Sequence, residues 1–400
     1  MRINTNAEWR LFGICLCANT LLMLVTSSNG DESGALYSVS CRLFMILIYG
    51  MFILTLFQDH FLLKKSKELL FCVAMFASAL ISYLVHPTGT FFQWLIIVLS
   101  YLEIPVLAIL MERLSFEVDI LRSKIFKSLV LLIAFFLIYR AFLLPVYDVF
   151  TGALTMGYSN SNRTAIYLLM ITCLCLSVGK LERKRIWKYS MLVVSGLLTV
   201  AMPLTQSRTA MFCIIATWIF WLFGDKLVKL LTRKTVLLLV IIPIVFVMVY
   251  LNLIEKGATW LSSTIIYGKS LDSGRKYIYW TCFEELQGNW LFGNYAFSPL
   301  ENKHNTMLSV LTAFGITGLI AFTVFYYVHF SKTLWKVTNV SGSIFPFFCM
   351  LAIYFSGMAE GATFTSGIMY AGMFGMIMLL ANENSTGKRE ENDNAKTNGY

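Results

Sequence analysis

The chain has 400 residues, of which 58% are hydrophobic and 14% charged, and its mean hydropathy is +0.70. A soluble domain is roughly half apolar and a quarter charged, so this composition excludes a soluble globular protein and indicates an integral membrane protein. The formal net charge of +10 would suit a nucleic-acid-binding protein, but the basic residues cluster in alternate loops between apolar runs. We therefore expect no nucleic-acid partner and a membrane lipid environment instead.

Long uncharged runs predict an all-α fold, that of a polytopic integral membrane protein with about twelve transmembrane helices. A helix needs about 20 apolar residues to cross about 30 Å of hydrocarbon. We place the spans near residues 11–28, 38–57, 69–85, 91–111, 128–147, 164–180, 191–206, 209–223, 235–252, 305–329, 343–360 and 362–381. No convincing cleavage site follows the first span, so we expect a retained helix rather than a signal peptide.

Basic residues fill alternate loops, which orients the chain. The loops after the second, fourth, sixth, eighth and tenth spans hold most of the 32 Lys and Arg residues. Loops of this kind stay in the cytoplasm, so we expect both termini there. Residues 1–381 then form one transmembrane domain, and the polar tail 382–400 is expected to be disordered in the cytoplasm. The amphipathic stretch 111–126 should lie along the inner surface.

A few basic residues fall on the opposite, outer side and are more informative than the abundant inner ones. They are Arg42, Arg140, Arg163, Arg208, Lys256, Lys269, Arg275, Lys276 and Lys303. Several lie beside or within apolar segments, where an unpaired cation is costly and an ionisable group is a functional hypothesis by default. Arg208 stands in a very short polar break, QSRT, between two spans. Snorkelling to lipid head groups is an equally good explanation for Arg208 and the favoured one for Arg140.

Two outer loops supply further polar candidates. In the loop 148–167, Asn160, Asn162 and Arg163 precede the sixth span. Side-chain amides both donate and accept hydrogen bonds and can therefore bind sugar hydroxyls, but Asn and Ser equally make turns and cap helices. We leave both interpretations open for this loop.

The largest predicted outer loop, 253–304, should contain a short amphipathic helix. After the SGR turn, Tyr277, Trp280 and Leu286 recur at near-helical spacing, and QGN and FGN then break the pattern. Such a helix would rest on the membrane with its aromatic side chains buried and hold Arg275 at its N-terminus.

The loop returns to the bilayer through Lys303, His304 and Asn305. A lone histidine near a helix start is more often a capping or surface residue than a functional one. The two glycines that follow, Gly315 and Gly318, suit close helix packing.

These groups together predict a site for a bulky anion at the outer surface. Guanidinium groups match phosphate geometry and stay charged at any relevant pH, and a histidine that titrates near neutrality can orient or deprotonate a hydroxyl. The nine cysteines are scattered, mostly within spans, and indicate neither a metal site nor a disulfide framework. A lipid-linked pyrophosphate fits such a site, and we expect no cofactor and no metal.

The segments TQSRTAMF, SGRKYIYW and KHNTMLSVLTAFGITGL, in this order, resemble the O-antigen ligase and polymerase superfamily of bacterial polysaccharide assembly. The resemblance covers about 150 residues of the C-terminal half, and the number of spans agrees with it. It implies a metal-independent, inverting membrane glycosyltransferase of the bacterial inner membrane that uses undecaprenyl-pyrophosphate-linked oligosaccharide, with its active site on the outer face.

Residue by residue, Arg208 matches the arginine of the family's S-R signature, Arg275 the loop arginine and His304 the histidine of its H-N motif. The resemblance implies that Arg208 and Arg275 hold the donor pyrophosphate and that His304 positions or activates the acceptor hydroxyl. Around these catalytic candidates we expect substrate-binding residues, namely Asn305, Arg163, Asn160, Arg140 and Lys303.

Several functions stay open. A polymerase transfers the glycan to another lipid-linked repeat unit, with a chain-length regulator as a candidate partner, and the GYSNSN segment resembles polymerases. An O-antigen ligase would transfer it to lipid A core. A secondary transporter or a lipid-linked oligosaccharide flippase is the alternative of another class, although acidic residues within spans, Glu103 and Glu360, are few. A metal-dependent transferase using Asp31 and Glu32 has little support.

Overall fold

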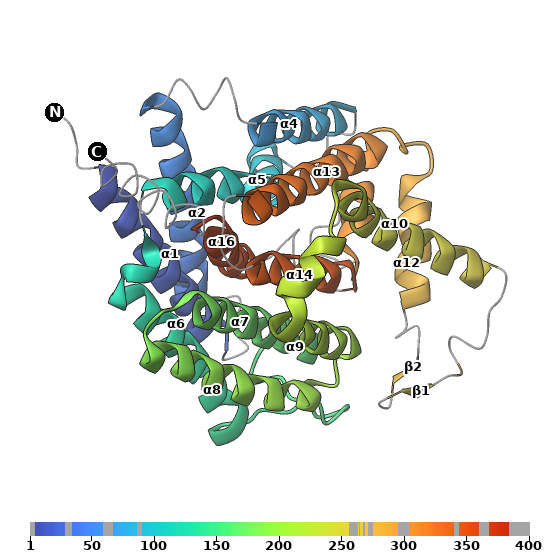
Figure 1. Ribbon diagram of the computed structural model, residues 1–400. Helices are drawn as coiled ribbons and strands as arrows, with labels where there is room; N and C mark the ends of the chain where they lie inside the picture. Colours follow the sequence, from blue (N-terminus) through green and yellow to red (C-terminus); the bar gives the residue numbers. More distant parts are fainter. Residues whose placement is uncertain are drawn as a thin grey trace.

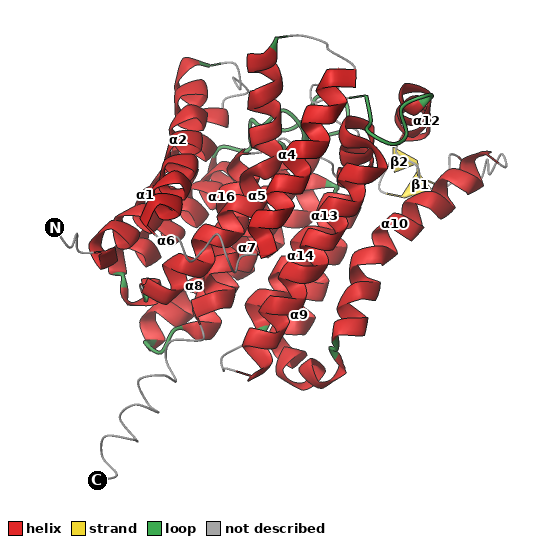
Figure 2. Ribbon diagram, turned by 90° about the horizontal axis from the view of Figure 1, so that it is seen from above, coloured by secondary structure: helices red, strands yellow, loops and turns green. Residues whose placement is uncertain are grey.

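The structure is a computed structural model that describes residues 5–28, 34–58, 67–85, 90–117, 119–255, 263, 265–266, 269–270, 275–294, 304–339, 344–359 and 368–383. It is a bundle of long helices that run between two ends of the molecule (Figure 2). Among the described residues, nine helices are long and apolar enough to cross a membrane, and two shorter apolar helices accompany them. The predicted fold class, an all-α polytopic membrane protein, is confirmed.

Each of the predicted spans coincides with a helix. The helices are α1 (Thr5–Ser27), α2 (Ala35–Gln58), α4 (Lys67–Val85), α5 (Phe91–Glu117), α6 (Lys124–Ile138), α7 (Ser161–Leu181), α8 (Arg185–Ala201), α9 (Arg208–Leu227), α10 (Arg233–Glu255), α13 (Thr306–Asn339), α14 (Phe345–Ala359) and α16 (Ile368–Glu383). A further helix, α12 (Arg275–Leu286), lies in the large loop, together with the two-residue strands β1 (Ile265–Ile266) and β2 (Lys269–Ser270). Short helical turns, η1 (Ile120–Arg122), η2 (Tyr139–Leu143), η3 (Met202–Thr205) and η4 (Val228–Leu230), join or extend the spans. The predicted disordered tail lies outside the described residues from 384 onward.

Helix α7 forms the centre of the bundle and is buried along nearly its whole length. It packs between α8, α14 and α16 (Figure 1). The Thr172 hydroxyl is satisfied within the helix, because it donates to the Leu168 carbonyl at 2.7 Å. In contrast, α2, α8 and α9 expose apolar side chains on one face, as expected of helices that meet lipid.

The stretch 111–126 does not form one continuous helix, and its place along the inner surface stays a prediction. Residues 111–117 complete α5, η1 follows, and α6 begins at Lys124 after the Ser123 cap. The apolar side chains of Leu114 and Ile120 are fully buried. A Cβ built on Gly13 of α1 would meet both of them, at 3.3 and 3.1 Å. The apolar face of this stretch therefore packs against α1 instead of lipid.

Helix α13 is broken at Gly315, whose φ of 67° and ψ of −165° are not helical. The segment 290–294 of the large loop docks on this break and completes its hydrogen bonds. Ile316 N–H donates to the Trp290 carbonyl at 2.9 Å, and Asn294 N–H donates to the Thr312 carbonyl at 2.8 Å. Within lipid an open backbone is tolerated only where protein satisfies it, so the loop is a fixed part of the bundle.

Two serines of α4 complete the junction around the break. The Ser78 hydroxyl lies 3.2 Å from the Phe314 carbonyl and 2.7 Å from the Thr317 hydroxyl. The Ser82 hydroxyl lies 3.3 Å from the Ala313 carbonyl. These contacts surround the Gly315 turn with hydrogen-bonding partners from a neighbouring helix.

At the far end of α13, lysines pair with Glu68, which is buried, and with Glu112, which is partly exposed. Lys332 Nζ lies 3.0 Å from Glu68 of α4 and 2.5 Å from Glu112 of α5, and Lys336 Nζ lies 2.6 Å from Glu112. Lys127 and Glu182, both nearly buried, form another pair between α6 and the end of α7. Each of these carboxylates has a cation beside it, as burial of a charge requires.

Replacing Gly315 with alanine should destabilise the fold. A Cβ there would lie 2.5 Å from the Gly293 nitrogen and from the Leu291 carbonyl oxygen, and the backbone conformation is almost exclusive to glycine. We expect a loss of at least about 1–3 kcal/mol of unfolding free energy from the backbone alone, measured by denaturation in detergent. Gly196→Ala is the matched control, because nothing lies within 4 Å of its Cβ position. Equal stability of the two variants would contradict the docked loop.

Candidate functional site

The N-terminal ends of α7, α9 and α13 gather at one end of the bundle. Helix α14 runs antiparallel to α9, because Phe348 near its start stacks on Phe220 near the end of α9 with ring centroids 4.1 Å apart. It is also antiparallel to α7, because Ser177 near the end of α7 lies 3.5 Å from the Cys349 sulfur. The starts of α7 and α9 therefore share an end with the last residues of α14.

Asn305 and Thr306 tie the start of α13 to the same place. Asn305 Nδ2 donates to the Met358 carbonyl at 2.5 Å, and the Thr306 hydroxyl donates to the Gly357 carbonyl at 2.7 Å. Asn305 Oδ1 accepts from Leu308 N–H at 3.0 Å and so caps the helix. Asn305 is 1% exposed. The structure thus gives this predicted substrate-binding residue a capping and packing role.

Helix α12 lies at this end of the bundle, roughly perpendicular to the long helices. In Figure 2 it is viewed along its axis, whereas the long helices lie in the plane of the picture. Its residues Tyr279, Cys282 and Leu286 pack against Leu308 and Leu311 of α13. We call this the α12 end and the lysine-rich end around Glu112 the opposite end.

The predicted short helix with glycine-bearing turns is confirmed: α12 spans Arg275–Leu286, and Gly288 and Gly293 follow it with positive φ. Arg275 is its first residue and is partly exposed. Tyr277 is 82% and Trp280 51% exposed on the protein surface, so neither packs on the bundle, and their burial in the membrane stays a prediction. The side chains that face α13 are offset from them by two residues, a register that aromatic spacing alone does not specify.

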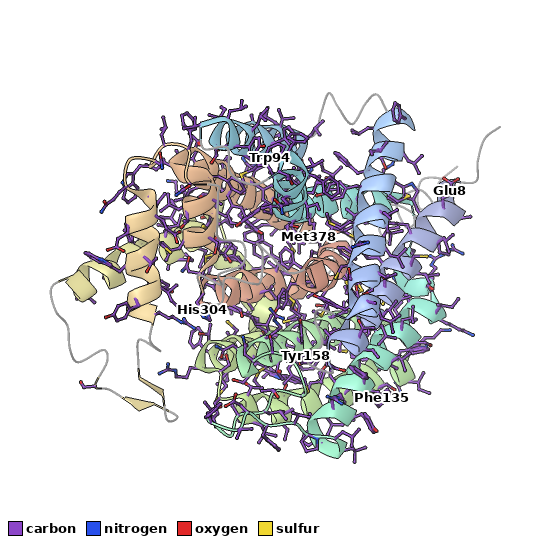
Figure 3. The ribbon with its side chains drawn as sticks, turned by 180° about the vertical axis from the view of Figure 1, so that it is seen from behind. Glu8, Trp94, Phe135, Tyr158, His304 and Met378 are labelled. Atoms are coloured by element: carbon purple, nitrogen blue, oxygen red, sulfur yellow. The ribbon has the colours of Figure 1, made fainter. Side chains whose placement is uncertain are left out.

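His304 directly precedes Asn305 and is partly buried. Its φ of 49° places it in the left-handed region, which histidine enters more readily than most residues. Figure 3 shows His304 between α12 and the α7 and α9 region of the bundle. The turn fixes the direction in which its imidazole leaves the backbone.

Among the described residues, every non-glycine residue with positive φ lies in a turn at the α12 end. These residues are Met156, Gln206 and His304, and they precede α7, α9 and α13. Such backbone strain persists where the surroundings enforce it and is common at functional sites. Sequence reasoning missed Met156 and Gln206, because neither residue type signals a left-handed turn.

Arg208 is the first residue of α9, after Ser207, and is partly exposed. The left-handed Gln206 just before it is held in place by its own side chain, whose Nε2 donates to the Thr151 carbonyl at 3.1 Å. The QSRT break therefore forms a defined turn, joined to the loop that precedes α7.

Arg140 has a structural role. Its Nε and Nη2 donate to the Met156 carbonyl at 3.1 and 2.7 Å, and Nη2 also donates to the Ser28 carbonyl at 2.7 Å. A Cβ on Gly157, which has a φ of 85°, would lie 2.3 Å from this Nη2. Arg140 thus joins the end of α1 to the turn before α7. Snorkelling to lipid head groups, the explanation that the sequence favoured for Arg140, does not account for these contacts.

Asn160 and Arg163 begin α7. Asn160 is exposed, and its Oδ1 accepts from the Arg163 backbone N–H at 2.8 Å, so the capping interpretation of this loop is confirmed. Arg163 is partly buried in the first turn. Lys303, the remaining predicted site residue, lies outside the described residues.

The structure thus brings the predicted site residues at the starts of α7, α9, α12 and α13 to one end of the bundle. Across the described part of the chain, His, Cys, Asp and Glu side chains form no group of three that could hold a metal ion. No protein-family model and no curated protein matches the chain.

We expect Arg140→Lys to lower stability, because an ammonium group cannot reproduce the two-carbonyl contact of the guanidinium. The loss should be about 1–3 kcal/mol of unfolding free energy, the cost of leaving buried acceptors without donors. Thermal denaturation in detergent measures it. Arg185→Ala, which removes an exposed arginine at the start of α8, should leave stability unchanged. Full stability of Arg140→Lys would show that the contacts are dispensable.

Proposed function

We propose that the protein is a metal-independent, inverting glycosyltransferase that transfers an undecaprenyl-pyrophosphate-linked glycan to the hydroxyl of another lipid-linked repeat unit. In this proposal the membrane is the bacterial inner membrane and the α12 end faces outward. The observation that carries it is the placement of Arg208, Arg275 and His304 at the starts of α9, α12 and α13, all at the end away from the paired lysines. The resemblance to the O-antigen ligase and polymerase superfamily rests on these same residues.

Helix N-termini support binding of an anion there. Each carries a partial positive charge and backbone N–H groups that lack helical acceptors. Arginines at the first position of α9 and α12 add full charges to two of these ends. A pyrophosphate diester offers several oxygens to such donors, and the guanidinium fork can bind two oxygens at once. The arrangement suits a leaving group that gains negative charge.

The proposed reaction uses these groups in one displacement. The acceptor hydroxyl attacks the anomeric carbon from the face opposite the leaving group, and His304 accepts the hydroxyl proton. A new carbon–oxygen bond forms as the bond to the pyrophosphate oxygen breaks, and the departing oxygen keeps the electron pair. Arg208 and Arg275 stabilise that charge, so no divalent ion is needed in this scheme.

Two alternatives stand beside this proposal. An O-antigen ligase would use the same donor site with lipid A core as acceptor. A flippase or secondary transporter is favoured by one specific observation, the break in α13 at Gly315, because transporters often bind substrate at discontinuous helices. Here, however, the loop segment 290–294 already occupies the hydrogen-bonding groups of the break.

Alanine replacement of Arg208, Arg275 or His304 should each abolish polymer while the protein stays in the membrane. The loss of one such charge-stabilising group typically costs about 100-fold or more in rate. Arg208→Lys should also fail if the contact is bidentate. The measurement is transfer between purified lipid-linked repeat units in vitro, with and without EDTA, and Arg185→Ala is the matched control. Unchanged transfer in all three alanine variants would refute the proposal.

The leaflet that accumulates substrate separates a transferase from a flippase. If the protein is a transferase, cells carrying Arg208→Ala should accumulate lipid-linked repeat units in the outer leaflet, where an added glycosidase reaches them. If it moves the lipid, the units should accumulate in the cytoplasmic leaflet and resist the glycosidase. A requirement for magnesium or manganese in vitro would favour a metal-dependent enzyme instead.

A further inference from the structure

Glu103 of α5 is a carboxyl group deep within the bundle. It lies 12 residues after the start of α5 at Phe91, about 18 Å along the helix axis. It is 2% exposed, and its Oε1 has no hydrogen-bond partner among the described residues. Because buried polar atoms are nearly always hydrogen-bonded, this oxygen requires an explanation.

Three carboxylates that pair with lysines show what Glu103 lacks. Glu68 and Glu112 each lie within 3.0 Å of a lysine ammonium, and Glu182 pairs with Lys127. Glu103 forms no ion pair within the described part of the chain. An ionised carboxylate in that position would cost several kcal/mol, since no cation offsets its loss of hydration. A neutral carboxylic acid carries no such cost and can also donate a hydrogen bond.

The titratable groups in electrostatic range of Glu103 belong to α2 and are neutral. They are Tyr37, Cys41 and Tyr49. The Tyr49 hydroxyl donates to the Leu99 carbonyl at 2.5 Å, so its hydrogen is not available to Glu103. The other helices packed on α5, namely α1, α4 and α16, add no charged side chain in that range among the described residues.

A series of tyrosines, of which Tyr37 is partly and the others fully buried, leads from this region toward the α12 end. Tyr37 is within electrostatic range of Tyr370 of α16. The Tyr370 ring lies 5.2 Å from that of Tyr167, and the Tyr167 ring lies 4.7 Å from that of Tyr158. Tyr158 lies among the helices of the bundle interior, whereas Phe135 points outward from its edge (Figure 3).

The two ends of this tyrosine series differ in their hydrogen bonding. The Tyr158 hydroxyl donates to the Leu24 carbonyl at 3.2 Å, near the turn that Arg140 holds. The Tyr167 hydroxyl, fully buried, has no hydrogen-bond partner among the described residues. The Tyr167 hydroxyl is therefore a second buried polar atom, after Glu103 Oε1, that needs a hydrogen-bond partner, and it lies between Glu103 and the α12 end.

We propose that Glu103 is an intramembrane proton-binding site, reached from the α12 end through the hydroxyls of Tyr158, Tyr167, Tyr370 and Tyr37. The two orphaned polar atoms, Glu103 Oε1 and Tyr167 OH, mark where water or a proton donor completes the hydrogen bonds. Loss of the proton would place a negative charge between α2 and α5, where no cation can pair with it. Proton binding at Glu103 thus couples pH to the packing of these helices. The inference is independent of glycan transfer.

A hydrophobic carbodiimide tests the protonated acid directly. The carboxylic acid adds across a C=N bond of the reagent. Its proton moves to nitrogen and its oxygen bonds to the central carbon, with no leaving group, and the adduct rearranges to a stable N-acylurea. With dicyclohexylcarbodiimide on the full chain in liposomes, mass spectrometry should find Glu103 labelled, and less so as pH rises. Glu68, Glu112 and Glu182, held beside lysines, are internal controls and should stay unlabelled.

Infrared spectroscopy provides a readout that does not depend on reagent access. The carbonyl stretch of a protonated carboxylic acid should be present in the wild-type protein and lost in Glu103→Gln. This variant should keep its thermal stability, because a neutral amide replaces a neutral acid, whereas Glu68→Gln should lower it by leaving Lys332 with one carboxylate fewer. Absence of the band in the wild type, or labelling of Glu103 no greater than that of Glu112, would overturn the proposal.

Two further measurements test the identity of the ligand and the route. Sodium chloride and choline chloride should give equal carbodiimide labelling, and protection by sodium would replace the proton with a metal cation. Tyr167→Phe removes the orphaned hydroxyl and should slow the response of Glu103 labelling to an external pH jump several-fold. A response as fast as in the wild type would eliminate the tyrosine route.

Discussion

The need to satisfy backbone hydrogen bonds inside a membrane is the constraint on which this structure depends. Helix α13 breaks at Gly315, and the carbonyls of Trp290 and Leu291 replace the acceptors that the helix loses there. The large loop is consequently anchored at 290–294, only a few residues after α12 ends. The same connection positions Arg275 at the start of α12 relative to His304 at the start of α13. A close contact of two glycine backbones, Gly293 and Gly315, therefore holds the geometry of the candidate site.

The charged side chains at the two ends of the bundle have different partners. At the opposite end, Lys332 and Lys336 neutralise Glu68 and Glu112 and fasten α13 to α4 and α5. At the α12 end, Arg140 is bound to backbone carbonyls, which stabilise its position without cancelling its charge. The α12 end also holds the N-termini of α7, α9 and α13, which carry partial positive charges.

The sequence was sufficient to predict the helices, because lipid requires long apolar runs and these are legible without knowledge of packing. It also predicted α12, since the SGR turn and the QGN and FGN breaks bound a short helical pattern. It failed where tertiary contacts decide the outcome. Leu114 and Ile120 look like a lipid-facing surface but pack on α1. Gly315 does allow the predicted close approach, but of the loop backbone at Gly293 and through a break in its own helix. The hydrogen bond from Asn305 to the end of α14 was likewise not visible in the sequence.

The interpretation of Glu103 changes once its surroundings are known. In the sequence, the scarcity of acidic residues within spans argued against ion coupling. The structure shows that the surroundings of an acidic residue matter more than the number of acidic residues. Glu68 is neutralised by Lys332, whereas Glu103 has no cation beside it among the described residues. A glutamate paired with a lysine binds helices together and stays ionised at ordinary pH, so it carries no proton to exchange. A buried carboxyl without a cation beside it must take its proton from elsewhere, and Tyr37, Cys41 and Tyr49 of α2 are the titratable groups of the described residues in its range. The proposed proton site within the bundle and the proposed anion site at the α12 end are therefore separate places in the structure.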